Sequence, residues 1–322
     1  MTHAHRFAAA FTACLLSVLS APTTGRTQTE YELTPLELPA GLAGNVVARD
    51  INNRGDVLGW VVPDRRVGVV VDKDGVRTFT IPGATYMEPD AITTNGTIAV
   101  QYFDLSGDRG PFLLDRKGRL TPVAVEGDWA FVNVWDVSDN GIVTGEVHTS
   151  GPVFRTLGFI QDRAETHIIE CPGARFTVLL AVNNQGTATG ACTGDSGTAR
   201  FIVNRDGVFT PLAAPGGLIF QAEAINNRGV VAGTWSDGIS SRAGVLEDGV
   251  LIPIDYPAPP TVDYQDPETG TTLQLTLGSS FTTITGINDP GQIVGHTEAT
   301  YFGPDFSFEV VRAFPFIGAP VQ

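Results

Sequence analysis

One short motif occurs six times along this chain of 322 residues and constrains its fold more than any other feature. Each copy contains a β-branched residue, a short polar side chain, two variable residues and a glycine, as in "INNRG". The motif glycines stand at positions 55, 96, 141, 186, 229 and 291, so every interval but the last is a little over forty, and the last is about half as long again. A period in the forties is typical of propeller blades or of a solenoid.

The chemistry of the motif predicts a hairpin between two strands, a and b. The β-branched residue favours extended backbone, and the Asn, Thr or Ser after it can bond the backbone of a tight turn. The glycine supplies a positive φ angle, and an apolar residue two positions later restarts a strand. A second glycine follows four residues later in every copy but one, where Val100 stands, and permits close approach of a neighbouring backbone.

A second hairpin, from strand c to strand d, follows the first in five copies. Its turns end at positions 75, 118, 164, 207 and 249, at a nearly constant distance beyond the motif glycines. Runs such as "VGVVV" before the turn and "VRTFTIP" after it have the composition of strands. Each repeat is therefore expected to form a four-stranded antiparallel meander.

The sixth copy ends after "VRAFPF" at Val311 to Phe316, without room for a strand d. The N-terminal stretch "TPLELPAGL", Thr34 to Leu42, matches the strand d stretch "TPLAAPGGL", Thr210 to Leu218, at six of nine positions. Pairing this orphan strand with the last repeat closes a ring and removes the open sheet edge. We therefore predict an all-β fold, a six-bladed propeller closed by its N-terminal strand, with a linear array as the alternative.

The chain begins with His3, His5 and Arg6 before an apolar run from Phe7 to Ser20 and then small residues. We interpret residues 1–21 as a signal peptide, because the run is shorter than the roughly 20 residues that cross a bilayer. A retained anchor is the alternative. We then expect a flexible N-terminus at 22–30, a propeller at 31–322 with a loop insertion at 257–280, and a secreted or periplasmic location.

Removal of the signal peptide takes away Arg6 and no acid, which leaves 19 basic and 35 acidic residues and a net charge of −16. This charge repels nucleic acid and anionic membranes, so neither is an expected partner. We expect a monomer. Two cysteines remain, Cys171 and Cys192, in a compartment that permits disulfides. Either they pair, or they are two buried small apolar side chains.

The motifs "INNRG", "INDPGQIVG" and "RAF" at Arg312 to Phe314 resemble the extracellular HAF repeat over nearly the whole mature chain. That resemblance implies an exported bacterial repeat protein and carries no general activity. The histidine of "HAF" is replaced in all six copies, so any role of that histidine does not transfer.

The loop face, which carries the b-to-c loops and the segments that cross between blades, is where the sequence varies most. Loops on a rigid scaffold often carry function, although they also vary where nothing constrains them. The candidate ligand-binding residues on or near this face are Trp60, Tyr102, Asp104, Asp108, His148, Asp195, Trp235, His296 and Tyr301. Flat rings stack on sugars or apolar ligands, but large aromatics are more often packed as core.

Three local motifs have simpler explanations than function. "GDSG" at Gly194 to Gly197 lies in a repeat loop without a serine protease context, so a turn is expected. "DLSGDRG" spaces acids at alternate positions, but it lacks the glycine and glutamate placement of a calcium loop. "RGD" at Arg54 to Asp56 contains the motif's own turn glycine. We expect no metal or cofactor, with Ca²⁺ the weak exception.

The leading hypothesis is therefore an exported binding or interaction module for a glycan, peptide or protein. No catalytic residues are assigned, because no catalytic constellation is visible. The alternatives are a secreted hydrolase or lyase with two acids in the funnel, drawn from Asp104, Asp108, Asp195 and Asp237, and a purely structural or adhesive protein.

Overall fold

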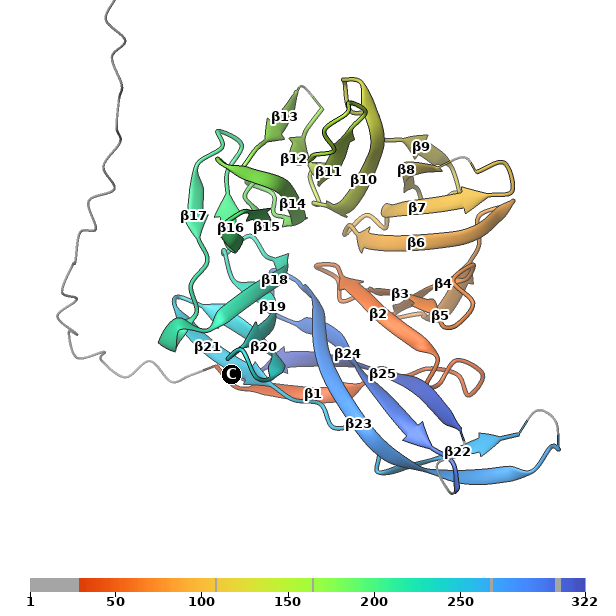
Figure 1. The fold of residues 1–322 in the computed structure, drawn as a ribbon. Helices are drawn as coiled ribbons and strands as arrows, with labels where there is room; N and C mark the ends of the chain where they lie inside the picture. Colours follow the sequence, from red (N-terminus) through yellow and green to blue (C-terminus); the bar gives the residue numbers. More distant parts are fainter. Residues whose placement is uncertain (1–28, 108, 164, 267–268, 305–307, 322) are drawn as a thin grey trace, which may run out of the picture.

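Six antiparallel sheets stand around a central axis, and the innermost strand of each faces that axis (Figure 1). The computed structural model describes residues 29–321 except 108, 164, 267–268 and 305–307. The predicted six-bladed, all-β propeller is confirmed. A single parallel pairing, Thr156 with Phe176, links the sheets of blades 3 and 4.

The first three blades follow the predicted a-b-c-d order. Blade 1 consists of β2 (Val46–Ile51), β3 (Val57–Val61), β4 (Gly68–Asp72) and β5 (Gly75–Phe79). Blade 2 consists of β6 (Ala84–Ile92), β7 (Ile98–Asp104), β8 (Arg109–Leu114) and β9 (Leu120–Pro122). Blade 3 consists of β10 (Trp129–Val137), β11 (Val143–Thr149), β12 (Thr156–Gln161) and β13 (Thr166–Ile169).

Blades 4 and 5 keep the same order, and the last blade departs from it. Blade 4 consists of β14 (Ala174–Val182), β15 (Ala188–Gly194), β16 (Gly197–Val203) and β17 (Phe209–Pro211), followed by a 3-10 turn, η1 (Pro215–Gly217). Blade 5 consists of β18 (Ile219–Ile225), β19 (Val231–Ser236), β20 (Ser241–Glu247) and β21 (Val250–Ile254). Blade 6 consists of β23 (Thr272–Ile287), β24 (Ile293–Phe302), β25 (Glu309–Pro320) and β1 (Tyr31–Pro35), with β22 (Thr261–Gln265) added beside β23.

The ring is closed by β1, as the sequence predicts. This strand pairs antiparallel with β25, from Tyr31 opposite Pro320 to Pro35 opposite Phe316. One further bond, from the Val321 N–H to the Glu30 carbonyl at 2.8 Å, holds the two chain ends together. The last blade thus receives its outer strand from the beginning of the described chain, and the ring has no open junction.

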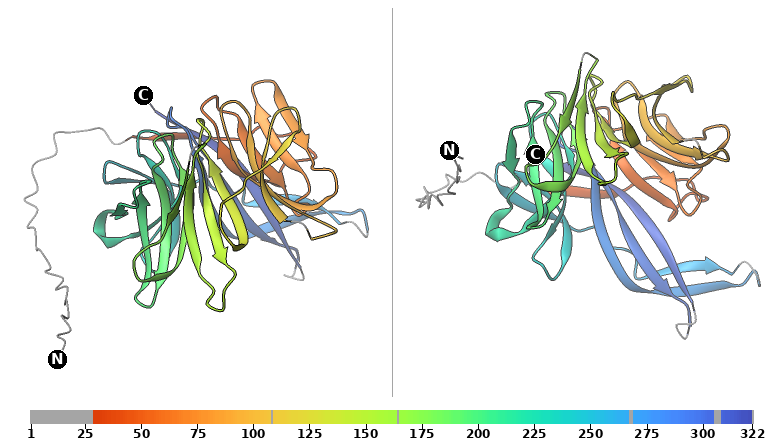
Figure 2. Two further views of the ribbon diagram at one scale, coloured as in Figure 1. Left: turned by 90° about the horizontal axis from the view of Figure 1, so that it is seen from above. Right: turned by 45° about the horizontal axis from the view of Figure 1, so that its top comes forward.

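The segment expected to be a loop insertion at 257–280 is largely strand, which corrects that expectation. It contains β22 and the first part of the 16-residue β23, paired from Thr261 opposite Thr276 to Gln265 opposite Thr272. These strands extend blade 6 past the rim of the ring (Figure 2). The extension has its own apolar cluster around the fully buried Tyr301 and Leu275. It is therefore a packed structural element, and we call these residues, 261–280, the arm of blade 6.

Every innermost strand carries a β-bulge one residue after the position that faces the second glycine. In blade 3, Gly145 faces Val134, and a Cβ on Gly145 would lie 1.9 Å from the Asn133 carbonyl oxygen. The same approach, at 2.0 to 2.4 Å, occurs at Gly59, Gly190, Gly233 and Gly295. The glycine therefore gives the bulged backbone room, as predicted. In blade 2, Val100 faces Pro89, and we have no physical account of how that blade accommodates the side chain.

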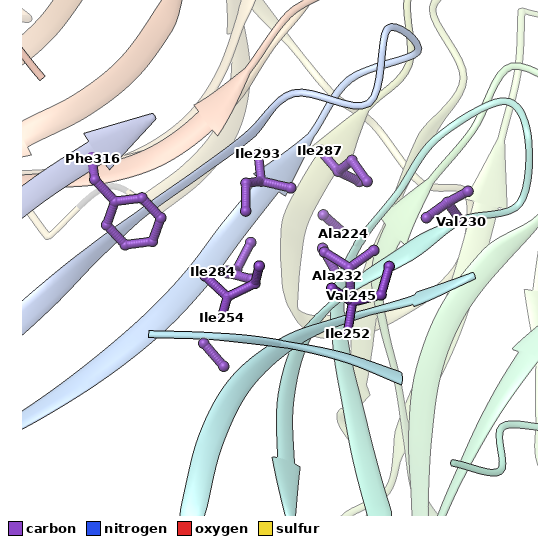
Figure 3. Packing of buried hydrophobic residues seen from close by; sticks show 11 residues of the cluster. Ala224, Val230, Ala232, Val245, Ile252, Ile254, Ile284, Ile287, Ile293 and Phe316 are labelled. Carbon is purple, nitrogen blue, oxygen red and sulfur yellow. The ribbon is translucent and has the colours of Figure 1, made fainter. Parts of the chain in front are cut away.

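The apolar core is divided among the spaces between neighbouring blades. Figure 3 shows the cluster between blades 5 and 6, where Val245, Ile252 and Ile254 meet Ile284 and Phe316. Comparable clusters lie between each of the other neighbouring pairs of blades. Stability therefore depends on each blade packing against two others, which makes ring closure a requirement of the fold.

The first polar residue of the motif joins neighbouring blades as well as shaping its own turn. In blade 5, Asn226 Oδ1 accepts the N–H groups of Arg228 and Val230, at 3.0 and 3.1 Å. Its Nδ2 donates across the junction to the Asn288 carbonyl of blade 6, at 3.1 Å. The turn bonds were predicted and the inter-blade bond was not. Such inter-blade bonds are made by Asn52, Asn183, Asn226 and Asn288.

The second polar residue of the motif closes the axis on the tight-turn face. Asn53 Nδ2 donates to carboxylate oxygens of Asp139 and Asp289, both at 2.8 Å, and so connects blades 1, 3 and 6. Asp289 also accepts the N–H of Asn227, and Asn184 N–H donates to Asn227 Oδ1. These side chains line the axial cavity at that end.

Cys171 and Cys192 are joined by a disulfide, with their Cα atoms 6.2 Å apart. It connects the segment between β13 and β14 to β15, across the entry to blade 4. A disulfide of this kind is typical of proteins outside the reducing cytoplasm. No helix among the described residues is long and apolar enough to span a membrane, and the predicted signal peptide lies outside the described residues.

Candidate functional site

The loop face holds a groove between blades 2 and 3, with a volume of about 970 Å³. Two predicted residues, Tyr102 from β7 and His148 from β11, line it together. The remaining aromatic and polar side chains of the lining are Gln101, Phe103, Phe112, Trp129, Phe131, Asn133 and Phe154. A volume of this order accommodates a ligand of drug size or somewhat larger.

A row of rings runs along the groove and into blade 4. The His148 imidazole lies 6.1 Å from the Phe131 ring, edge to face, and 5.3 Å from the Phe154 ring. Phe176 continues the row, 6.3 Å beyond Phe154. Phe131 and Phe154 keep 45% and 46% of their surface exposed, although large aromatics usually bury most of theirs. The two rings therefore present apolar surface to the groove.

Polar side chains from three strands fix the imidazole between these rings. Glu146 Oε1 accepts Asn133 Nδ2–H at 3.0 Å and contacts His148 Nε2 at 3.2 Å. Thr156 Oγ1 contacts His148 Nδ1 at 3.3 Å. The carboxylate can only accept, so we assign the imidazole proton to Nε2 and the hydroxyl proton to the bond with Nδ1. Glu146 is buried behind the groove wall and acts as a positioning residue.

Sequence reasoning missed Trp129, Phe131 and Phe154, the side chains that give the groove its apolar walls. Trp129 opens β10, where its Nε1–H donates to the Glu126 carbonyl at 2.9 Å. The available signal was the crowding of aromatic residues at the start of strand a and in the b-to-c loop of one blade. Blades 2 and 6 also carry aromatic residues at these places, and exposure itself is not visible in a sequence.

Trp60 and Trp235 lie at corresponding places in other blades and do not join the groove. Trp60 is 8% exposed, and the Arg65 guanidinium lies 5.5 Å from its ring. Trp235 donates its Nε1–H to the Ala243 carbonyl at 3.1 Å, and Arg242 lies over its ring. Trp235 also packs against the apolar cluster between blades 4 and 5.

The predicted acids of the loop face are distributed over separate loops. Asp104 accepts the backbone N–H and hydroxyl of Ser106 in its turn, Asp195 is exposed in the β15–β16 turn, and Asp237 accepts the N–H groups of Ile239 and Ser240. Asp108 lies outside the described residues. Asp104 and Asp237 therefore stabilise their own turns.

The last two predicted residues belong to blade 6. Burial lowers the pKa of His296 to about 4, so this imidazole is neutral near pH 7. Tyr301 has no exposed surface, and its hydroxyl donates to the Pro259 carbonyl at 2.9 Å. It is part of the core of the arm, which removes it from the candidate ligand-binding residues.

A second polar site, which sequence reasoning also missed, lies on the axis. The six bulges turn one side chain per blade into a cavity of about 80 Å³. These side chains are Arg49, Asp90, Trp135, Leu180, Glu223 and Thr285. A cavity of this size holds a few water molecules. Bulge positions are not visible in a single sequence, so the pattern could not have been predicted.

Two carboxylates beside the cavity join blades through both of their oxygens. Asp50 accepts the N–H groups of Ile51 and, across the junction, Ile92, each at 2.7 Å. Asp136 accepts those of Val137 and Val182, also at 2.7 Å. Burial raises the pKa of both carboxyls. The backbone hydrogen bonds favour the ionised form and oppose this rise, but they do not cancel it. Their geometry is that of structural acceptors.

Asp90 is the buried acid among the six side chains that the bulges turn into the cavity. Its side chain is 2% exposed, and burial raises its pKa to about 7, although Arg49 at 3.4 Å favours the ionised form. Within the described part of the chain, Nε of Arg49 and Nε1 of Trp135 are buried without a hydrogen-bond partner. Both donors therefore fit a water-filled cavity.

We expect Asp90 to make the protein less stable as the pH rises. Its pKa is about 7 when folded and about 3.9 when unfolded, so its favourable contribution is complete below about pH 4. That contribution is lost as the pH rises through 7. Urea unfolding between pH 4.5 and 8.5 measures the slope, and Asp90→Asn should flatten it. Parallel pH profiles for the two proteins would contradict the assignment.

No group of three or more His, Cys, Asp or Glu side chains that could hold a metal ion occurs among the residues with described positions. No protein-family model and no curated protein sequence matches the chain.

Solved structures with a similar arrangement are β-propeller proteins of different kinds. TolB from Acinetobacter baumannii is 12% identical with a TM-score of 0.48, and the match covers 88% of this chain and 66% of that one, just under two thirds. A streptogramin B lyase is 11% identical with a TM-score of 0.41, covering 91% and 98%. The Aleuria aurantia lectin is 10% identical with a TM-score of 0.43, covering 87% and 96%.

Proposed function

We propose that this chain is an exported binding module that holds its ligand in the groove between blades 2 and 3. The observation that carries the proposal is the pair of half-exposed rings, Phe131 and Phe154, on either side of a hydrogen-bonded imidazole. The rings offer apolar surface, while Asn133 offers a polar group whose position is fixed by its bond to Glu146. A few placed polar groups in an apolar wall are the usual composition of a ligand site.

Export is part of the same proposal and has two supports. The N-terminal residues have the pattern of a signal peptide, and the disulfide between Cys171 and Cys192 suits an oxidising compartment. We place the protein among HAF-like exported repeat proteins, on the motifs that resemble that repeat. Its net negative charge disfavours nucleic acid and anionic membranes as partners.

A hydrolase or lyase is the second candidate, favoured by the raised pKa of Asp90 in the axial cavity. The cavity is small, and both oxygens of the neighbouring Asp50 and Asp136 are occupied by backbone N–H groups. The axial acids are therefore better explained as structural groups, and binding in the groove is the stronger proposal.

The test uses the mature chain and the neutral fluorescent dye Nile red, together with a panel of oligosaccharides and peptides. We expect the dye to bind the groove, and Phe131→Ala with Phe154→Ala to weaken that binding by at least about tenfold, because each ring offers stacking and apolar area. Ile239→Ala is the matched control, since Ile239 is 96% exposed in the b-to-c loop of blade 5.

A bound panel member should raise the unfolding free energy by about 2.7 kcal/mol at 100 times its Kd. The double Phe variant should abolish this increase while Ile239→Ala retains it. If neither the dye nor any panel member distinguishes the double variant from the control, the groove is not a binding site. The structural or adhesive alternative would then replace the proposal.

A further inference from the structure

We propose that the ligand of the groove is a carbohydrate, with a sugar ring stacked on the Phe154 and Phe131 side of the groove and a hydroxyl group bonded to Asn133 Oδ1. This inference rests on the proposed function and adds the chemical class of the ligand. It follows from the kind of polar groups that the groove presents, their fixed position, and the local charge.

The apolar part of the site matches one face of a sugar ring. The face of an aromatic ring is electronegative, so it attracts the weakly positive C–H groups that a sugar ring presents on its flat side. Phe131 and Phe154 are held by different elements, β10 and the b-to-c loop, and the imidazole of His148 lies between them. A ring stacked on either phenyl group therefore has its edge near a polar side chain.

The polar part of the site offers acceptors for hydroxyl groups. Glu146 takes the amide N–H of Asn133 through Oε1, which turns the amide so that Oδ1 has no hydrogen bond to any described residue. Asn133 lines the groove, so this oxygen is available to a hydroxyl donor. A ligand without hydroxyl or amide donors would leave the acceptor unpaired, at a cost in affinity.

The fixed geometry favours a rigid ligand over an adaptable one. Four side chains, Asn133, Glu146, His148 and Thr156, bond one another from β10, β11 and β12. Because these groups are already ordered, binding costs little side-chain entropy, and a sugar ring brings few rotatable bonds of its own. The site would therefore discriminate between sugars by the positions of their hydroxyl groups.

The local charge argues against an anionic ligand. Glu146 lies directly behind the groove wall, and Asp128, which accepts the Ser150 hydroxyl at 3.0 Å, lies at the end of the neighbouring loop. No lysine or arginine lines the groove within the described residues. A neutral sugar fits this environment better than a phosphorylated, sulfated or carboxylated one.

The experiment separates recognition of hydroxyl groups from apolar stacking. The mature protein is screened for binding to neutral oligosaccharides, and the best binder is titrated by calorimetry against three variants. His148→Phe keeps an aromatic surface and removes the imidazole bonds to Glu146 and Thr156 that help to position the Asn133 amide, Asn133→Ala removes the amide, and Ile239→Ala is the control. Nile red titration is run on each variant in parallel, and circular dichroism verifies that each is folded.

We expect Asn133→Ala to weaken oligosaccharide binding by about tenfold, the value of one hydrogen bond. His148→Phe should weaken it by up to the same factor, because the amide loses its fixed position, while dye affinity stays within about twofold for both variants. Equal losses for dye and sugar would show that the polar groups only shape the groove, and would overturn the inference. Dye binding without any oligosaccharide binder, or peptide binding in its place, would overturn the carbohydrate class and leave the groove as a binding site. Failure of the dye as well would refute the proposed function itself.

Discussion

A chain that lacks residues 29–35 should not fold cooperatively, because its last blade loses the strand that closes the ring. Deletion exposes the edge of β25 over the whole register from Phe316 to Pro320. It also removes Tyr31 and Leu33 from the apolar cluster between blades 5 and 6. We expect a loss comparable with the whole stability of a typical domain, about 5 kcal/mol or more. Thermal and urea unfolding followed by circular dichroism measure it.

The matched control is a circular permutant that keeps every described residue except Thr29 and moves the break in the chain. The chain would begin at Leu36, run to Val321, pass through an added Asn-Gly turn and end with residues 30–35. The turn suits a two-residue hairpin, and the ends already meet through the bond from Val321 to Glu30. We expect this permutant to unfold cooperatively near the full-length midpoint. A deletion variant as stable as the full-length chain would show that β1 does not hold the ring.

The ring and its closure were predictable because they follow from repeated local chemistry. A motif that starts a turn in six places, and a strand-like stretch at the N-terminus without a blade of its own, require few assumptions. The bulges were not predictable in the same way. The second glycine indicates that a neighbouring backbone approaches closely. It does not indicate which side chain the bulge turns toward the axis, and in blades 1 and 3 these are Arg49 and Trp135.

The arm of blade 6 was wrongly expected to be a loop because the repeat pattern was read at the scale of whole blades. At the scale of single residues, Leu273, Leu275 and Leu277 alternate with polar neighbours, which is the period of a half-buried strand. A strand extended past the ring obeys local pairing while departing from the repeat. The extra residues in the long interval between the last two motif glycines therefore form additional strand in blade 6.

The candidate site was predicted only in part, for a physical reason. Tyr102 and His148 meet in one groove because adjacent blades place the ends of their b strands side by side. Trp60 and Trp235 have similar positions in the repeat, yet each is covered by an arginine of its own blade. Whether an aromatic ring is covered depends on neighbours distant in sequence, so a single sequence cannot rank these positions.

The polar residues of the motif gained a role that sequence reasoning had not given them, and this leads to the second large effect. Asn226 is 3% exposed and bonds both its own turn and the next blade. In Asn226→Asp, one oxygen can keep the turn bonds, but the other replaces an N–H donor and faces the Asn288 carbonyl. A buried carboxylate opposite an acceptor should cost about 3 kcal/mol or more.

Asn226→Ser separates the two roles, because the chain already uses serine at the same place in another blade. Ser138 Oγ accepts the Ile142 N–H at 3.1 Å and so maintains its turn. Asn226→Ser should therefore keep the turn and lose only the inter-blade bond, at about 1 kcal/mol. Urea unfolding of both variants at pH 7 measures the difference. Equal, small losses for Asp and Ser would mean that the bond to blade 6 contributes little, and that packing between the blades, together with ring closure, holds the blades in place.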